Sequence, residues 1–220
     1  MTRMGRNTEP LGQAVLWLLM AGAGCASQPK IEPAVTANST PGRVTIAVAP
    51  ALNLSGSTDF DPNRFADLMA GELTYAEGVS VVPVSRVLGV LAGQGLDRVE
   101  SPAHAREIAS RVGADAILVF AVTEYDPYDP PRIGISAQLL TASGEAPAAQ
   151  MQRRFDASHA DVDAEIRTFA QKRVSGGSVY GWRKYVVSQQ HYIQYCCASA
   201  IKSLLNGRNG PEVLGAGHER

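Results

Sequence analysis

The chain has 220 residues, of which 45% are hydrophobic and 19% charged, with 20 Lys and Arg against 21 Asp and Glu. A charge balance this even excludes a strong basic field for nucleic acid, and no acidic tract suggests a store for cations. The residues from about 43 to 207 suffice for one domain with a hydrophobic core.

The N-terminus has the pattern of a bacterial secretory signal. Arg3 and Arg6 precede an uncharged apolar stretch at residues 11–20, and small residues then lead to Cys25. The apolar stretch is shorter than the roughly 20 residues that a membrane-spanning helix needs. The segment resembles a lipobox, so we expect residues 1–24 to be a lipoprotein signal peptide and Cys25 to carry the lipid. Gly22 stands three residues before Cys25, where a lipobox usually has a large aliphatic residue. Cleavage by an ordinary signal peptidase is therefore the alternative.

Two segments are predicted to lack a fold of their own. Residues 25–42 are rich in Pro, Ser, Thr and Asn and poor in large apolar residues, so they should form a flexible tether. Residues 207–220 contain four glycines and should form a disordered tail. Removal of residues 1–24 takes away Arg3, Arg6 and Glu9, which leaves a mature chain with a net charge near −2.

Between these segments the hydrophobic pattern alternates between strand and helix. We expect strands at residues 44–50, 79–84, 114–123, 133–139 and 150–156. Helices are expected to begin at Pro62 and Pro102, with a short helix capped by Ser85 that ends at Leu91 and further helices at 161–173 and 179–205. Asp61 before Pro62 and Ser101 before Pro102 are helix starts, and Gly113 is a helix stop. Phe60 and Phe65 have the spacing of a hydrophobic staple.

This order predicts an α/β fold of the mixed α+β kind, formed by one domain over residues 43–206. Early crossover helices favour parallel strands, whereas the later short connections favour an antiparallel meander. The sheet should therefore be mixed, with about five strands, and flanked by helices. The strand at 114–123 is almost continuously apolar and should be central, with both of its faces covered.

Two segments carry a resemblance to a known family. They are the opening strand with its loop, VTIAVAPALNLSGS, and the unit from Ala105 to Val119 that ends in GADAILV. Over about residues 43–144 the chain resembles envelope lipoproteins of the CsgG / LpoB / PelC-like group. The resemblance implies a non-catalytic domain that assembles into rings or docks onto a synthesis or secretion partner. The residues after Cys25 are Ala26 and Ser27, without the aspartate that retains some lipoproteins in the inner membrane. The resemblance therefore implies the periplasmic face of the outer membrane.

The motifs of common enzymes are missing from the sequence. It has no G-x-S-x-G elbow, no Walker loop and no G-x-G-x-x-G after a strand, and the four histidines stand singly. The best metal candidate is His159 with Asp161, Asp163 and Glu165, but acidic residues in the first turn of a helix are explained by its dipole. We therefore predict no catalytic, cofactor or metal site, and expect that the chain is not an enzyme.

Two aromatic segments are candidate interaction surfaces. The first is a proline-stiffened loop with Tyr125, Tyr128 and Arg132, which could also be a rigid hairpin connection whose tyrosines cover the sheet edge. The second is the long C-terminal helix with Tyr180, Trp182, Tyr185 and Tyr192, as a subunit interface or a belt against membrane head groups. For this helix, the simpler alternative is packing across the sheet with the tyrosine hydroxyls reaching water.

The adjacent residues Cys196 and Cys197 are expected to be small buried hydrophobic side chains, because neighbours on a helix point in different directions. An intermolecular disulfide is the minority alternative.

Two functional hypotheses follow from these features. The favoured one is a non-catalytic, lipid-anchored envelope lipoprotein that acts as a scaffold, by self-association or by docking to an envelope machine. Its partners would be the membrane through the lipid, an envelope protein or a further copy, with no cofactor and no nucleic acid. The alternative is a periplasmic module that binds or transforms a small or cell-wall ligand.

Overall fold

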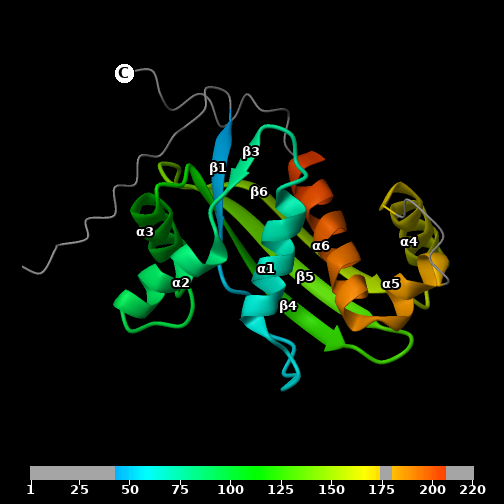
Figure 1. Cartoon of the computed structure of the whole chain (residues 1–220). Coiled ribbons are helices and arrows are strands. Elements are labelled where there is room, and N and C mark those ends of the chain that lie inside the picture. The colour runs from blue at the N-terminus through cyan, green and yellow to red at the C-terminus, as the bar shows by residue number, and fades with distance from the viewer. Residues whose placement is uncertain (1–42, 174–179, 207–220) are drawn as a thin grey trace, which may run out of the picture. The chain divides into compact units, whose positions relative to one another are not determined.

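The computed structural model describes residues 43–173 and 180–206, which form a sheet with helices on both of its faces (Figure 1). The predicted fold class, a mixed α/β domain, is confirmed. The predicted signal peptide, Cys25, the tether and the tail lie outside the described residues.

The sheet contains six strands. In chain order they are β1 (Val44–Val48), β2 (Leu52–Asn53), β3 (Val79–Val81), β4 (Ala116–Asp126), β5 (Arg132–Thr141) and β6 (Pro147–Asp156). The spatial order is β3-β1-β4-β5-β6, and the short β2 pairs with the later part of β4. β1 is parallel to β3 and to β4, whereas β4, β5 and β6 form an antiparallel meander. The predicted mixed sheet and central β4 are confirmed.

The helices follow the predicted starts closely. They are α1 (Pro62–Leu73), α2 (Val84–Gly93), α3 (Pro102–Val112), α4 (Ala160–Arg173), the 3-10 turn η1 (Gly181–Arg183), α5 (Lys184–Val187) and α6 (Gln189–Asn206). The Asp61 side chain caps α1 by accepting from the backbone N–H groups of Asn63 and Arg64 at 3.0 and 3.1 Å. Next to this cap, the Phe60 and Phe65 rings lie 4.8 Å apart, as a hydrophobic staple requires.

The boundaries of α3 are set in the same local way. Ser101 caps its start by accepting from the His104 N–H at 3.1 Å. Gly113 ends it at φ 71°, a left-handed conformation that glycine adopts without steric cost. The helix therefore ends at Val112, shortly before Ala116 begins the central strand β4.

Two predicted helix boundaries are wrong. Ser85 does not cap α2, which begins at Val84 behind Pro83 and has no side-chain cap. The predicted helix at 179–205 is broken at Ser188, whose backbone is extended, so that α5 and α6 are separate. The carbonyl of Ser188 accepts from Tyr192 N–H and its hydroxyl contacts His191, which is the behaviour of a residue at a helix start. The pattern of apolar residues continues from α5 into α6, so the pattern does not indicate the break at Ser188.

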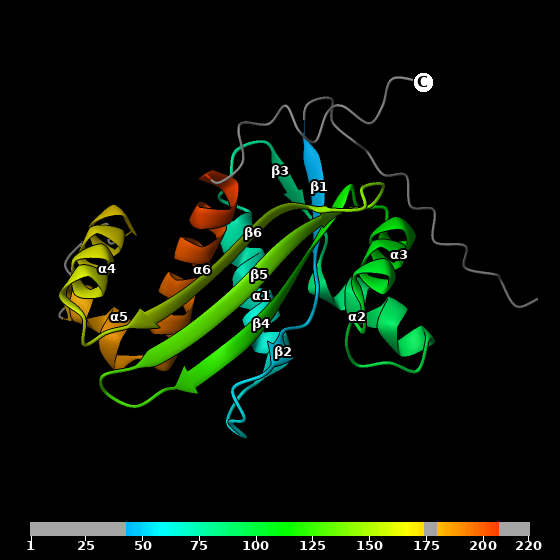
Figure 2. The same cartoon turned by 180° about the vertical axis from the view of Figure 1, so that it is seen from behind.

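Two hydrophobic clusters lie on opposite faces of the sheet. The larger one packs α1, α5 and α6 against the meander, and includes Leu118 and Phe120 from β4. The smaller one lies under α2 and α3 and includes Ile117 from β4 and Leu140 from β5. The α2–α3 pair reaches only the start of β4 and the end of β5, and none of the described helices covers the remainder of the meander on that face (Figure 2).

Candidate interaction surfaces

The predicted loop with Tyr125 is in part a strand. β4 extends to Asp126, and an irregularity between Val122 and Glu124 turns Tyr125 toward the core. Its ring packs edge-on against Phe60 and Phe65 at centroid distances of 5.8 and 5.7 Å, and burial raises the pKa of its hydroxyl. Tyr125 is therefore a core residue and presents no ring to a partner.

The other two residues of this segment differ in exposure. Tyr128 lies in the β4–β5 turn and is 73% exposed. Arg132 forms an ion pair with Asp126 at 2.5 Å, and this hydrogen bond lowers the pKa of the Asp126 carboxyl. The pair closes the base of the turn and leaves Arg132 partly exposed, so Tyr128 is the most exposed of the three predicted residues.

The aromatic residues of the C-terminal helices divide in the same way. Tyr185 and Tyr192 are buried, and burial raises the pKa of both hydroxyls. The Tyr192 hydroxyl is buried and has no hydrogen-bond partner among the described residues. The expectation that it reaches water is therefore wrong for Tyr192. Tyr180 is 70% exposed, and Trp182 lies half-buried under the Arg167 guanidinium at 3.8 Å from its ring.

Cys196 and Cys197 are buried free thiols in α6. Burial raises the pKa of both, so neither carries the thiolate that disulfide chemistry needs. The prediction that they are small buried hydrophobic side chains is confirmed.

The predicted metal candidate breaks up into ordinary ion pairs. Asp163 accepts from Arg167 at 2.8 Å and Glu165 accepts from Arg153 at 2.8 Å, while His159 is mostly exposed and 3.8 Å from Asp156. Within residues 43–173 and 180–206, no group of three or more His, Cys, Asp or Glu side chains is placed to hold a metal ion.

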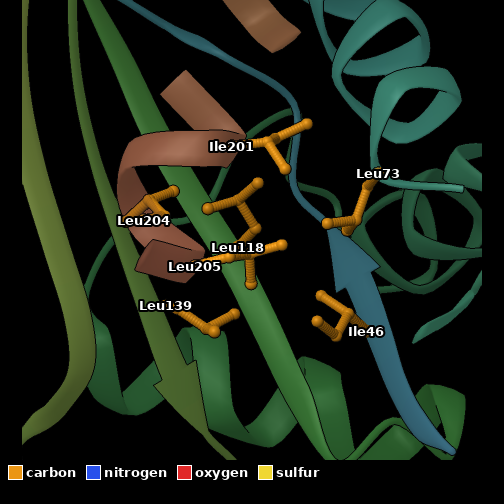
Figure 3. A pocket seen from close by; sticks show the side chains of 7 residues that line it. All are labelled: Ile46, Leu73, Leu118, Leu139, Ile201, Leu204 and Leu205. Carbon is orange, nitrogen blue, oxygen red and sulfur yellow. The ribbon is translucent and has the colours of Figure 1, made fainter. Parts of the chain in front are cut away.

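A small pocket opens between the sheet and the end of α6 (Figure 3). Its lining is entirely aliphatic and comes from five elements, β1, α1, β4, β5 and α6: Ile46, Leu73, Leu118, Leu139, Ile201, Leu204 and Leu205. Its volume is about 10 Å³, the space of one water-sized sphere. A space of this size and polarity accepts a methyl group and offers nothing to orient a substrate.

On the face of the meander that carries α2 and α3, the side chains beyond these two helices are mostly polar or small. Rows of cross-strand neighbours on this face join Val119, Gln138 and Gln150, then Ala121, Ser136 and Gln152, then Glu124, Gly134 and Arg154. Gln150, Gln152 and Arg154 are exposed, whereas Gly134 and Ala121 are small and buried. The result is a shallow surface with amide groups along its β6 side.

β6 is also an edge of the sheet. It is a ten-residue strand at the end of the strand order, and no described strand pairs with its outer side. Ten residues are longer than the five or six of an ordinary strand, so the edge offers a long row of free backbone donors and acceptors. Sequence reasoning predicted a weak strand here and gave it no role.

A buried ion pair that the sequence did not predict holds α4 in place. Glu72, in the last turn of α1, is buried and accepts from the Arg173 guanidinium at 2.7 Å and from the Gln194 amide at 2.8 Å. Arg173 also lies over the rings of Tyr75 and Phe169 at 4.4 and 4.8 Å. These contacts join α1, α4 and α6 through the Glu72 carboxylate.

The sequence contains one further signal that the even overall charge conceals. Residues 166–206 include Arg167, Lys172, Arg173, Arg183, Lys184 and Lys202 but no Asp or Glu. The acidic residues of the domain all precede Ile166, so the C-terminal helices carry a net positive charge and the rest a net negative one. Counting charges by segment would have found this.

None of the described helices is both long and apolar enough to cross a membrane.

No protein-family model matches the chain, and no curated protein sequence is significantly similar to it. Its fold is similar to that of the LpoB C-terminal domain from Salmonella enterica, with 16% identity, 51% of this chain and 82% of the other covered, and a TM-score of 0.44. The lipoprotein GNA1162 from Neisseria meningitidis matches at 19% identity over 60% of this chain and 99% of its own, with a TM-score of 0.46. The PelC dodecamer from Paraburkholderia phytofirmans matches at 15% identity, 77% and 90% coverage and a TM-score of 0.40.

These neighbours include LpoB and PelC, so the predicted resemblance to envelope lipoproteins of that group agrees with the structure comparison. At such identities and TM-scores, no partner, activity or assembly is carried over from them.

Proposed function

We propose that the protein is a non-catalytic, lipid-anchored component of the cell envelope that assembles with a second copy of itself by pairing the two β6 strands. The single observation that supports this most strongly is the free outer edge of β6. A strand edge of this length offers main-chain hydrogen bonds to another strand, which is the basis of strand addition.

Proteins usually protect such an edge with charged side chains. In β6, both arginine side chains instead bind partners within the chain and do not extend along the edge. Arg153 turns to the helix side, where it contacts Glu165 at 2.8 Å and the Ser199 hydroxyl at 3.2 Å. Arg154 lies over the opposite face, where it contacts Glu124 at 2.6 Å and Asp156 at 2.9 Å. The edge therefore carries no free charge to repel a second strand.

The sequence of β6 also suits a second copy. In an antiparallel pair centred on Gln150 of both copies, Arg153 lies opposite Pro147 of the other copy and Arg154 lies opposite Ala146. Like charges do not meet, and Pro147, which lacks an N–H donor, stands at the end of the ladder. The two copies are then related by a two-fold axis, the commonest symmetry of soluble oligomers.

The remaining parts of the proposal rest on the sequence and on the pocket. The pattern up to Cys25 supports lipid attachment at the periplasmic face of the outer membrane, and the aliphatic pocket offers no polar group for a reaction. Asp126, whose pKa is lowered, is tied into an ion pair, and Tyr195, whose pKa is raised, is packed in the core.

The association can be tested in solution on the chain from residue 25 with Cys25→Ser. Light scattering should find a concentration-dependent dimer. Gln150→Lys with Gln152→Lys should weaken the dimer at least about tenfold, because four lysines would gather at the paired edges. The matched control is Ser136→Lys with Gln138→Lys on β5, on the same face but one strand inward, and its dimer constant should stay within about twofold. A monomer at all concentrations, or equal losses in both variants, would overturn the proposal.

A further inference from the structure

We propose that a second surface of this domain binds the anionic surface of a phospholipid membrane. It consists of the end of α4, η1 and α5, and we call it the basic-aromatic surface. Its residues are Lys172, Tyr180, Trp182, Arg183, Lys184 and Val187. The inference deepens the proposed function, because it states which side of the anchored domain would meet the lipid.

The first observation is the exposure of large apolar and aromatic side chains next to cations. Tyr180 and Val187 are 70% and 78% exposed, among the most exposed large hydrophobic residues that the structure describes. Lys184 and Val187 are one turn apart in α5, so they lie on one face. Aromatic rings with a polar end and basic side chains with long stems both favour the boundary between water and lipid.

The second observation is that the ring of Trp182 is held in position. Arg167 stacks on it at 3.8 Å, and Asp163 holds that guanidinium at 2.8 Å. The ring of Trp182, in η1, is therefore held against α4. A preoriented ring loses little freedom when it enters an interface.

The third observation is the electrostatic asymmetry of the chain. No acidic residue occurs between Ile166 and Asn206. Within the described residues, Lys172, Arg183 and Lys184 make no ion pair, whereas Arg167 and Arg173 are paired with carboxylates of other turns. The surface thus has three cations without an ion pair among the described residues. Basic side chains of this kind are attracted to the anionic phosphate head groups of a membrane.

The attachment point allows this orientation. The 18 residues from Cys25 to Gly42 can span at most about 60 Å, whereas the 11 residues of β4 are about 36 Å long. A lipid on Cys25 therefore leaves the domain free to turn the basic-aromatic surface to the membrane, at a high effective concentration of lipid.

The test uses the chain from residue 25 with Cys25→Ser, which has no acyl group and retains Trp182 as its single tryptophan. Its probe is a vesicle of phosphatidylethanolamine with phosphatidylglycerol, compared with phosphatidylcholine alone. We expect partition onto the anionic vesicles, weakened by salt, with a blue shift of Trp182 fluorescence. Arg183→Glu with Lys184→Glu should lower the partition coefficient at least about tenfold.

The control is Arg86→Glu with Arg98→Glu, on and after α2, which makes the same change in net charge elsewhere and should alter partition less than about twofold. Lys172→Glu with Lys184→Glu serves as a second variant if circular dichroism shows the first to be unfolded. Absence of partition, unchanged fluorescence, or equal losses in the patch and control variants would overturn the inference. None of these results depends on β6 or on an acyl group at Cys25, so a failure here is distinct from a failure of the proposed assembly.

Discussion

Glu72 illustrates at the scale of one residue how this domain holds its helices together. It lies in the last turn of α1, where the helix dipole disfavours a negative charge, and it is nevertheless buried. Its position depends on the Arg173 guanidinium and the Gln194 amide, which together satisfy the carboxylate. Removal of one partner would leave a buried charge without compensation, which is more costly than removing both.

We therefore expect Arg173→Met to lower the free energy of unfolding by about 3 kcal/mol. The double variant Glu72→Leu with Arg173→Met should recover most of that loss, because no buried charge remains. Urea unfolding followed by circular dichroism measures both. A single variant that costs less than about 1 kcal/mol, or a double variant that is worse than the single one, would contradict the role given to this pair.

Asp156 is the second buried carboxylate, and its stabilising effect should depend on pH. Hydrogen bonds from the Ser158 hydroxyl at 2.6 Å and its backbone N–H at 3.0 Å lower the pKa of this carboxyl below its ordinary value. A carboxyl with a lowered pKa stabilises the fold above its unfolded value of about 3.9, and this stabilisation is lost as the pH falls through the folded pKa.

Ser158→Ala should accordingly lower the free energy of unfolding by about 1 kcal/mol at neutral pH. The difference from the unaltered chain should shrink as the pH drops below about 4. Unfolding curves recorded from neutral to acid pH give this difference directly. If it stays constant over that range, the charge on Asp156 is not what the Ser158 hydroxyl stabilises.

At the scale of elements, helix starts were the most predictable features. Asp61 with Pro62 and Ser101 with Pro102 predicted α1 and α3 because a cap is a local hydrogen bond between neighbours in sequence. The break at Ser188 was missed because hydrophobic periodicity continues from α5 into α6. Tyr125 was assigned to a loop because the following prolines dominate the local pattern, whereas pairing with β5 extends β4 by several residues.

The cap of α1 offers a direct test at this scale. Asp61→Ala should lower the free energy of unfolding by about 1 kcal/mol, because two backbone N–H groups lose their acceptor. Asp59→Ala removes an exposed carboxylate two residues earlier that caps no helix, and should change stability by less than about 0.5 kcal/mol. Equal effects of the two substitutions would show that the charge rather than the cap matters.

At the scale of the whole molecule, the sequence predicted the fold class better than the surfaces. A mixed sheet with a buried central strand follows from the order and apolarity of the segments. The free edge of β6 and the pair Glu72–Arg173 depend on which distant elements end up side by side, and no local pattern encodes that. Of the predicted interaction residues, Tyr128, Arg132, Tyr180 and Trp182 retain exposed surface, whereas Tyr125, Tyr185 and Tyr192 are in the core.

Lipid attachment belongs to this scale because it fixes where the molecule works. Cells grown with radiolabelled palmitate should label the intact protein, and Cys25→Ala should abolish the label. Cys196→Ala with Cys197→Ala is the matched control and should keep it, since both thiols are buried. Label that persists after Cys25→Ala would contradict the anchor.

The most direct test of the proposed assembly is a disulfide between two copies at β6. In the antiparallel pair, cysteines that replace Gln150 in both copies lie close enough for a bond in an oxidising compartment. Gln138 is the register neighbour of Gln150 on β5, so cysteines at that position would be three strand spacings apart, about 14 Å, which is too far.

We therefore expect Gln150→Cys, or Gln152→Cys if the pair is centred nearer to that residue, to give a dimer that reductant dissolves on a non-reducing gel of whole cells. Gln138→Cys should stay monomeric under the same conditions. Monomers alone from both β6 positions, or a dimer of equal yield from Gln138→Cys, would contradict pairing of the β6 strands.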